Sequence, residues 1–250
     1  MHRVDALAAV FALAVGAVVL LSACSEAETP AHDAAISTPA APTAPEAAIT
    51  VVEPKPGDWV KIPMTVKGTA SVFEGTVVIA VESADGSKTF CRTLATASEG
   101  APGRGSFEAQ IAFPPPYEAP TDARLQVYSE NPANGSVQNL VSVPFVIWHI
   151  LPPLFVESPL CGDEVKSPVR VAVTYAVEGE LIVVIKDSSG SELARTVQQV
   201  YGYEGGRGTL IQDLDFSLPD GPQAGTIEAF SSPREGIVEN VFSVPVALVP

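Results

Sequence analysis

Basic residues, histidines and cysteines are scarce in this chain of 250 residues. It contains 14 Lys and Arg against 29 Asp and Glu, which gives a net charge of −15. A protein that binds nucleic acid needs a basic face that neutralises phosphates, so this charge argues against nucleic acid as a partner. Three His and three Cys leave little material for a metal site. We therefore predict no metal, no cofactor and no catalytic residue.

Helical periodicity is also missing after the first 24 residues. The chain has 23 Pro and 19 Gly, which disfavour helices and suit a protein of strands and turns. Apolar residues make up 46% of the sequence, enough to bury a core. These features predict an all-β fold.

The N-terminal segment has the pattern of an export signal. An unbroken apolar run, Ala6–Leu21, is followed by Leu21-Ser22-Ala23-Cys24. This ending resembles the lipobox of bacterial lipoproteins, which implies a signal peptide over residues 1–23 and a lipid-modified Cys24. The alternative is an uncleaved membrane anchor, because Ala6–Ala23 reaches the lower length limit for spanning a bilayer. Both interpretations predict that the rest of the chain lies outside the cytoplasm, held at a membrane.

The segment after the signal is predicted to be a tether. Residues 24–48 are rich in Ala and contain four prolines, with no aromatic residue and no Lys or Arg. Such a composition cannot bury enough apolar surface to offset the entropy lost on ordering. We expect a disordered linker that holds the folded part away from the membrane.

The remainder of the chain contains a tandem repeat of about one hundred residues. The matched motifs are Gly57-Asp58 and Gly162-Asp163, Glu74-Gly75 and Glu178-Gly179, Gly103-Arg104-Gly105 and Gly206-Arg207-Gly208, and Ser142-Val143-Pro144 and Ser243-Val244-Pro245. They keep the same order, and their offset falls only from 105 to 101. This ordered series indicates a duplication. We predict one domain over residues 49–150 and a second over 151–250.

Short segments rich in β-branched and aromatic residues occupy matching places in the two copies. The predicted strands are Met64–Val66, Thr76–Val81, Phe107–Phe113, Leu125–Tyr128 and Val137–Val146, then Val169–Tyr175, Leu181–Ile185, Thr209–Phe216, Thr226–Phe230 and Val238–Leu248. Asp85-Gly86 and Ser189-Gly190 lie between strand candidates, as hairpin turns require. About seven short strands per hundred residues is typical of a β-sandwich.

Two motifs of the first copy carry a family resemblance. Phe73-Glu74-Gly75-Thr76-Val77, followed by the segment from Gly100 to Phe107, resembles the immunoglobulin-like domain associated with bacterial spore germination proteins. The second copy resembles a diverged version of it. The resemblance implies two tandem immunoglobulin-like β-sandwiches and a place in the cell envelope, and it implies no enzyme activity.

Four polar residues that recur in both copies are candidate site residues. Arg104 and Arg207 each lie between two glycines, and Asp58 and Asp163 each follow a glycine. Each arginine would either hold its own domain together through a carboxylate or carbonyl, or present its guanidinium to a ligand. We favour the structural role for both arginines.

The remaining thiols, Cys91 and Cys161, have no cysteine counterparts in the other copy. A pair inherited within one domain is therefore excluded, and a bridge between the domains would need Cα atoms within about 7 Å. Free Cys packs well as a small buried apolar residue. We expect two unpaired thiols.

These observations predict a non-catalytic lipoprotein of the cell envelope. Its two domains would bind envelope proteins or wall glycans, or act as a spacer. One alternative is an envelope hydrolase with a carboxylate site that no motif reveals, because two acids can meet from distant positions. The other is a purely structural spacer without a ligand.

Overall fold

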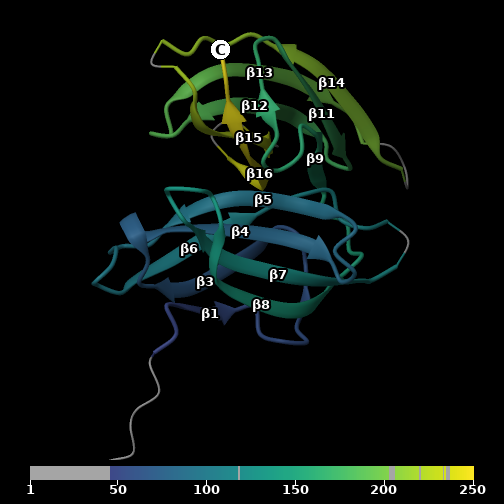
Figure 1. The fold of residues 1–250 in the computed structure, drawn as a ribbon. Helices are drawn as coiled ribbons and strands as arrows, with labels where there is room; N and C mark the ends of the chain where they lie inside the picture. Colours follow the sequence, from purple (N-terminus) through teal and green to yellow (C-terminus); the bar gives the residue numbers. More distant parts are fainter. Residues whose placement is uncertain (1–45, 118, 203–205, 220, 233, 235–236) are drawn as a thin grey trace, which may run out of the picture. The chain divides into compact units, whose positions relative to one another are not determined.

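The structure is a computed structural model that describes residues 46–117, 119–202, 206–219, 221–232, 234 and 237–250. The predicted signal peptide (1–23), Cys24 and the predicted tether up to residue 45 lie outside the described residues. The described chain forms strands in four sheets, two sheets for each half (Figure 1). The all-β prediction and the two immunoglobulin-like sandwiches are confirmed. Within the described ranges, no helix is long and apolar enough to cross a membrane.

The first sandwich comprises eight strands and one short 3-10 turn. Its elements are β1 Ile49–Glu53, β2 Trp59–Val60, β3 Met64–Ala70, η1 Phe73–Gly75, β4 Thr76–Ser83, β5 Thr89–Thr96, β6 Gly105–Ile111, β7 Thr121–Glu130 and β8 Val137–Ile147. One sheet has the strand order β1-β3-β6, and the other has the order β2-β8-β7-β4-β5.

The second sandwich repeats this topology strand for strand. Its elements are β9 Leu154–Ser158, β10 Glu164–Val165, β11 Val169–Tyr175, β12 Gly179–Asp187, β13 Glu192–Val200, β14 Gly208–Leu214, β15 Gln223–Ser232 and β16 Glu239–Leu248. The sheets have the orders β9-β11-β14 and β10-β16-β15-β12-β13. Even the parallel pairing recurs, because β2 pairs with β8 and β10 pairs with β16 while the other ladders are antiparallel. The duplication seen in the sequence therefore extends to the complete strand topology.

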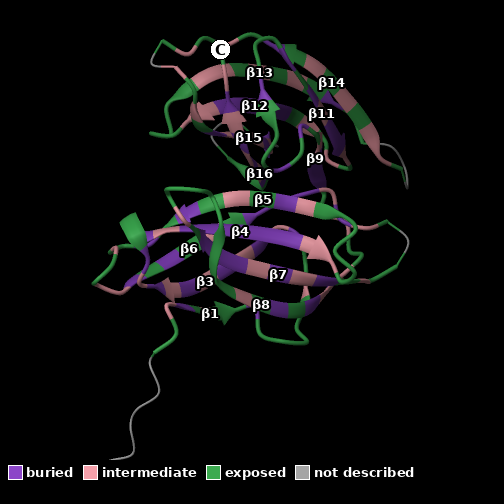
Figure 2. Cartoon of the chain, viewed as in Figure 1, coloured by how far each residue is buried: buried purple, intermediate pink, exposed green. Residues whose placement is uncertain are grey.

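Alternating burial explains why these segments form strands. Along β3 the side chains of Met64, Val66 and Ala70 are buried and their neighbours are half-exposed. Successive side chains of a strand point to opposite faces of the sheet, so this alternation places one apolar row between the sheets. In β4, Val77, Ile79 and Val81 face the same core. Figure 2 shows the resulting bands of buried and partly exposed residues along the strands.

The two predicted hairpin turns are confirmed. Gly86 (φ 74°) connects β4 to β5, and Gly190 (φ 84°) connects β12 to β13. Glycine adopts this left-handed conformation without a Cβ penalty. In the first turn the Ser83 hydroxyl donates a hydrogen bond to the Asp85 carboxylate, and the Ser87 N–H does the same. These bonds, that of Ser83 first, lower the pKa of Asp85 to about 2.

Candidate functional site

The two predicted aspartates close equivalent loops before β2 and β10. The Asp58 carboxylate accepts a hydrogen bond from the N–H of Lys55 at 2.8 Å. The Asp163 carboxylate accepts one from the N–H of Leu160, also at 2.8 Å. This is the local side-chain-to-backbone bond with which Asp stabilises turns. One oxygen of each carboxylate is therefore used within its own loop.

The neighbouring glycines dock these loops onto the last strand of each sandwich. Gly57 donates its N–H to the carbonyl of Pro144 at 2.8 Å, and Gly162 donates to the carbonyl of Pro245 at 2.9 Å. Both glycines have φ +85°, a conformation that side-chain-bearing residues rarely adopt. The repeated Gly-Asp pair thus serves to fold the loop and fix it to the sheet.

Arg104 joins three groups at the start of the first sandwich. Its guanidinium donates to the carbonyl of Ala47 at 2.6 Å and to the Thr69 hydroxyl at 3.1 Å. Its Nε lies 3.2 Å from the carboxylate of Glu46. The arginine therefore fastens the segment that enters β1 to the adjacent strand β3.

Arg207 lies at the equivalent place in the second sandwich. Its guanidinium donates to the carbonyl of Leu151 at 3.4 Å, one residue before the position that corresponds to Ala47 in the first copy. Its guanidinium carbon lies 5.6 Å from the centre of the Phe155 ring, a cation–π distance. Both arginines thus contact the entry segment of their own sandwich, and Arg207 makes the weaker hydrogen bond.

A further repeated pair has a structural role that the sequence did not reveal. Asn139 (φ 56°) and Asn240 (φ 54°) occupy bulges at the start of β8 and β16. Their side-chain amides donate to the Ser129 and Ser231 hydroxyls at 3.0 and 2.9 Å. Asn tolerates the left-handed region better than most residues. The only sign of this role in the sequence was that Asn recurs at the same position of both copies.

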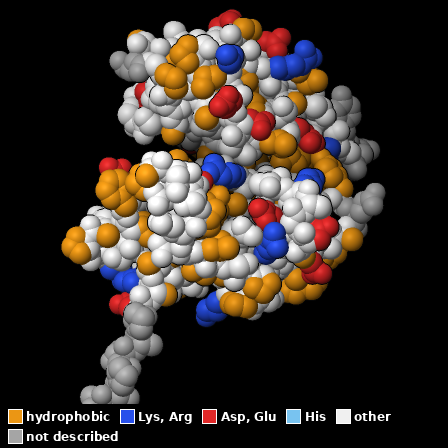
Figure 3. Space-filling view, in the orientation of Figure 1, with side chains coloured by type: hydrophobic (Ala, Val, Ile, Leu, Met, Phe, Trp, Pro, Cys, Tyr) orange, Lys and Arg blue, Asp and Glu red, His pale blue; other side chains and the backbone are white. Residues whose placement is uncertain are grey.

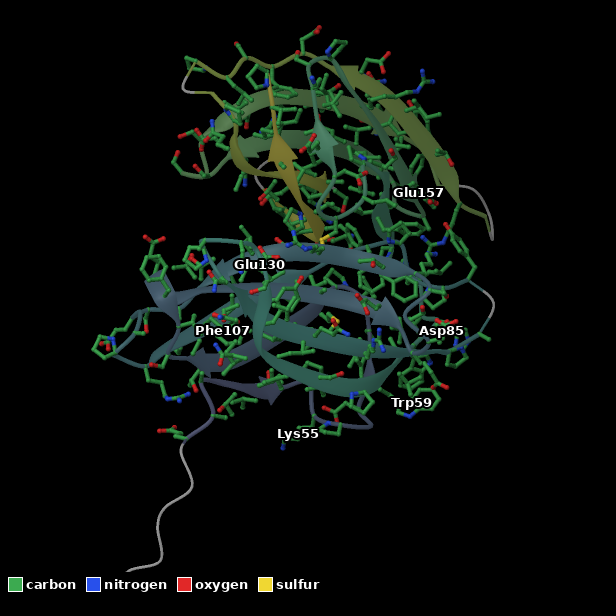
Figure 4. All side chains as sticks on the ribbon, in the orientation of Figure 1. Lys55, Trp59, Asp85, Phe107, Glu130 and Glu157 are labelled. Carbon is green, nitrogen blue, oxygen red and sulfur yellow. A yellow bond between two sulfur atoms is a disulfide. The ribbon has the colours of Figure 1, made fainter. Side chains whose placement is uncertain are left out.

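The expectation of two unpaired thiols is wrong. Cys91 of β5 and Cys161, just before β10, form a disulfide with a Cα–Cα distance of 4.8 Å, within the range for such bonds. Figure 4 shows this yellow bond next to β5. The residues come from different copies, so the bridge is the inter-domain one that repeat position alone left open. Cys91 and Cys161 are both buried, and burial is compatible with free thiols as well as with a disulfide. The sequence therefore could not distinguish the two.

A polar contact also joins the two sandwiches. The Tyr117 hydroxyl donates to the Glu157 carboxylate of β9 at 2.5 Å, and Glu157 also accepts from the Thr174 hydroxyl at 2.9 Å. The Tyr117 ring packs edge-on against Phe155. Burial and the contact with Glu157 raise the pKa of Tyr117 to about 12. No sequence motif indicated this pair.

A cleft of about 460 Å³ lies beside the disulfide. Its walls are Arg92–Leu94 of β5 on one side and Gly162, Asp187 and Ser188 on the other. Residues 224–226 of β15 and 245–247 of β16 complete the lining. A Cβ at position 162 would clash with the carbonyl oxygen of Arg92. Glycine at this position therefore allows the two backbones to approach closely.

The charged groups of this cleft are already engaged. Arg92 donates to the Glu130 carboxylate at 2.8 Å and to the Tyr128 hydroxyl at 3.4 Å. Asp187 accepts from the backbone N–H groups of Ser189 and Ser191. Hydrogen bonds in this turn, the Ser189 hydroxyl first, lower the pKa of Asp187. The cleft therefore has a charged rim whose groups are paired locally.

An exposed tryptophan packs against a half-buried one in the first sandwich. Trp59 of β2 is 57% exposed, and its ring meets that of Trp148 edge-on at 5.5 Å. The Lys61 ammonium lies 5.8 Å from the Trp148 ring centre. Figure 4 labels Trp59 at the margin of the first sandwich. The second copy has Glu164 where the first has Trp59, so this feature is not duplicated.

Acidic and basic side chains are interspersed over the face drawn in Figure 3. The part of the chain that the structure describes contains no group of three or more His, Cys, Asp or Glu arranged to hold a metal ion. The repeated polar residues instead serve as caps, turns and ties between strands.

A model of a known protein family matches most of the first sandwich. Residues 48–136 match the family model of the immunoglobulin-like domain of bacterial spore germination. The match agrees with the family expected from the motifs at Gly75 and Gly100–Phe107. It stops short of the last strand of the first copy, and the second copy is related to the first by the shared topology described above. No curated protein sequence matches the chain.

The matches to solved structures are weak. A biofilm-associated protein BSP domain shares 16% identity at a TM-score of 0.26, covering 81% of this chain and 30% of that one. Fibronectin(III)-like modules of Clostridium thermocellum CbhA share 10% at 0.22, covering 80% and 93%. The teleost fish polymeric Ig receptor ectodomain shares 11% at 0.24, covering 81% and 98%. Similarities of this size do not bear on function.

Proposed function

We propose that the chain is a non-catalytic lipoprotein that presents two immunoglobulin-like domains to a ligand of the cell envelope. The lipobox-like Leu21–Cys24 segment supports a lipid anchor on Cys24. The residues after it, rich in Ala and Pro, suit a tether between a membrane and the folded part.

The disulfide is the observation that carries this proposal. Disulfides form and persist in oxidising compartments outside the cytoplasm. The Cys91–Cys161 bridge therefore supports export, independently of the N-terminal signal. It also ties two sandwiches that are otherwise joined by a short connection, which suits a module that holds a ligand surface at a set position.

The use of the repeated polar residues favours a scaffold over an enzyme. Asp58 and Asp163 fold equivalent loops, and Arg104 and Arg207 fasten equivalent entry segments. A carboxylate pair for hydrolysis has to be aimed at a substrate. These side chains instead bind backbone and side-chain groups of their own sandwich.

Among envelope ligands, a wall glycan is favoured by the exposed indole of Trp59. An exposed indole offers a flat apolar face together with an N–H donor, the combination that a sugar ring with its hydroxyl groups requires. Lys61 and Trp148 lie beside it and would add a cation and a second aromatic edge.

The anchor is tested by fractionating cells that express the Cys24→Ser chain. We expect release from the membrane or an accumulated precursor, because the thiol that accepts the lipid is gone. Unchanged processing and unchanged membrane retention would contradict lipidation.

The ligand is tested by sedimenting the purified Cys24→Ser chain with isolated wall glycan. We expect saturable retention that Trp59→Ala weakens at least tenfold. Phe73→Ala is the matched control, since Phe73 is equally exposed on the same sandwich. Equal loss in both variants, or retention independent of Trp59, would refute the assignment of this surface. Release of soluble wall fragments during the assay would refute the non-catalytic proposal.

A further inference from the structure

The outer face of the five-stranded sheet in the first sandwich carries an apolar row. Val78 of β4 pairs with Leu94 of β5 on one side and with Tyr128 of β7 on the other. Val78, Tyr128 and Ala80 form a buried cluster of their own, separate from the main core. They therefore lie on the sheet face that points away from the core.

The row continues onto β8. Val137 pairs with Glu130, and Leu140 follows the bulge at Asn139, opposite Tyr128. The row thus crosses four strands. We call the five residues Leu94, Val78, Tyr128, Leu140 and Val137 the first outer stripe. Its Leu94 end also lines the cleft beside the disulfide.

The second sandwich carries the same row in the same register. Ile182 of β12 pairs with Val197 of β13 and with Phe230 of β15. Val241 follows the bulge at Asn240, and Val238 precedes it. We call the five residues Val197, Ile182, Phe230, Val241 and Val238 the second outer stripe.

The two ends of each stripe are exposed at equivalent positions, whereas Val78, Tyr128 and Ile182 in the middle are buried. The exposed fractions are 61% for Leu94 and 44% for Val197, 54% for Val137 and 57% for Val238, and 52% for Leu140 and 49% for Val241. Scattered exposed apolar residues are normal on proteins, but contiguous patches mark interaction sites. Here the same three positions are exposed and aliphatic in both copies.

The charges that flank the stripes are paired. In the first sandwich Arg92 lies 2.8 Å from Glu130 and Arg124 lies 2.8 Å from Glu82. These ion pairs balance the charges next to the stripe, in a chain whose net charge is −15.

The second sandwich shows the same balance. Lys186 lies 2.5 Å from Glu228 and Arg195 lies 3.1 Å from Glu192. Two further acids of these faces, Asp122 and Glu180, lie at the ends of the ladders. A highly charged partner of either sign would gain little from surfaces balanced in this way. The surface that complements these faces is itself apolar and has paired charges of both signs at its edge. Each outer stripe is such a surface, so a second copy of the chain would fit.

The available area agrees with a pair of like chains. The stripe is the apolar row of a larger sheet face. Four strands about 4.8 Å apart and about seven residues long, at about 3.3 Å per residue, give that whole face roughly 400 Å². One face is too small for a stable interface. Two faces together reach roughly the 800 Å² per partner of a standard interface.

We propose that the two outer stripes are the contact surfaces of a homodimer, in which a second copy of this chain packs sheet against sheet. A two-fold axis presents one patch to the same patch of the other chain, or exchanges the two patches symmetrically. The duplication supplies the second patch, and the two weak contacts made by one pair of chains reinforce each other.

The test is sedimentation equilibrium of the Cys24→Ser chain without wall material or membrane, from about 1 to 100 µM. We expect a dimer that dissociates on dilution. Leu140→Asp or Val241→Asp alone should raise the dissociation constant at least tenfold, because each places an unpaired charge in the contact. The double variant should remain monomeric over the whole range.

The matched controls are Val52→Asp and Ile211→Asp. These side chains are as exposed as those of the stripes, but they belong to the three-stranded sheets, on β1 and β14. They should leave the dissociation constant unchanged. All four variants replace exposed side chains, and unchanged thermal melting checks that each one folds.

A monomer at every concentration would overturn the proposal, and so would a dimer that the control variants weaken as much as the stripe variants. Photo-crosslinking in cells from positions 140 and 241 gives a second readout. A covalent dimer is the expected product, and crosslinking only to other proteins contradicts the proposal. Glycan binding through Trp59 is measured separately, so either result can fail without the other.

Discussion

The two sandwiches share one strand topology, but their cores are packed differently at one place. At one step of the ladder between β3 and β6, the first copy pairs Gly68 with Phe107, and a Cβ on Gly68 would clash with the Phe107 ring. The equivalent positions in the second copy are Val173, which is fully buried, and Leu210. A large ring beside glycine in one copy and two medium side chains in the other occupy similar space. The duplication therefore preserved volume at this site while it exchanged the residues.

The surfaces diverged further than the cores. Trp59 in the first copy corresponds to Glu164 in the second, whereas the loops that follow Gly57 and Gly162 keep the same hydrogen bonds. Core positions must match in volume, and turn positions must match in backbone conformation. Neither constraint applies to a residue on the surface. We therefore take a surface residue that is kept or replaced between the two copies as a guide to function.

The largest expected effect comes from removing the bond that makes the two copies one unit. Replacing both Cys91 and Cys161 by Ala should lower the free energy of unfolding by about 4 kcal/mol, because the bridge closes a loop of 70 residues. The unfolding transition should then separate into one step per sandwich. Urea unfolding measures both effects, and wild-type protein in reductant is the control. An unchanged midpoint would show that the bridge contributes little.

Gly68→Val tests whether the two copies exchange volume. It should destabilise the first sandwich by about 2–3 kcal/mol, since the added side chain overlaps Phe107 and the Thr50 carbonyl. Adding Phe107→Leu recreates the pairing of the second copy and should recover part of the loss. A double-mutant cycle by urea unfolding measures the coupling between the two sites. Strict additivity would mean that the exchange is not compensatory.

The two repeated arginines should contribute differently to the free energy of unfolding. Arg104→Ala should cost about 1–2 kcal/mol, because it removes hydrogen bonds to Ala47 and Thr69. Arg207→Ala should cost about 1 kcal/mol, because it loses one long bond and a cation–π contact. Thermal melting measures both, and Arg170→Ala on an exposed strand position is the control. Wild-type melting of Arg104→Ala combined with lost ligand binding would instead favour a binding role for the arginines.

The smallest effect concerns the polar contact between the copies. Tyr117 has its pKa raised from 10 to about 12, so the folded protein holds this proton more tightly than the unfolded chain does. Stability from this group is complete below pH 10 and is lost as the pH rises from about 10 towards 12. Tyr117→Phe should flatten the decline of melting temperature over that range. An identical alkaline decline in the variant would exclude Tyr117 as its cause.

The strands missed by sequence inspection lie mainly at sheet edges. In β13 the exposed and half-exposed residues Thr196, Gln198 and Gln199 obscure the apolar alternation, because an edge strand covers little core. β5 contains Cys91, which packs inward, and Arg92, which points outward beside Tyr128. The short strands β2 and β10 are two residues long, too short for any periodicity. Central strands were predicted because both their neighbours and the core impose alternation.

The candidate site residues divide along the same line. The repeat alone singled out Asp58, Asp163, Arg104 and Arg207, because a residue that recurs in both copies often has a role in the shared fold. Their partners were not evident, since Arg104 and Ala47 are 57 residues apart. Tyr117 and Glu157 are likewise far apart in the chain, with 40 residues between them in numbering.

The sequence by itself determined the duplication, the all-β character and the hairpin turns, because each of these depends on residues that are close along the chain or on a repeated order. The disulfide, the cleft beside it and the two outer stripes were decided only by the tertiary structure. Each depends on which strands become neighbours and on which face a side chain meets. A shift of one residue in register would reverse every such face. Local patterns do not contain that register, because packing across the whole sheet sets it.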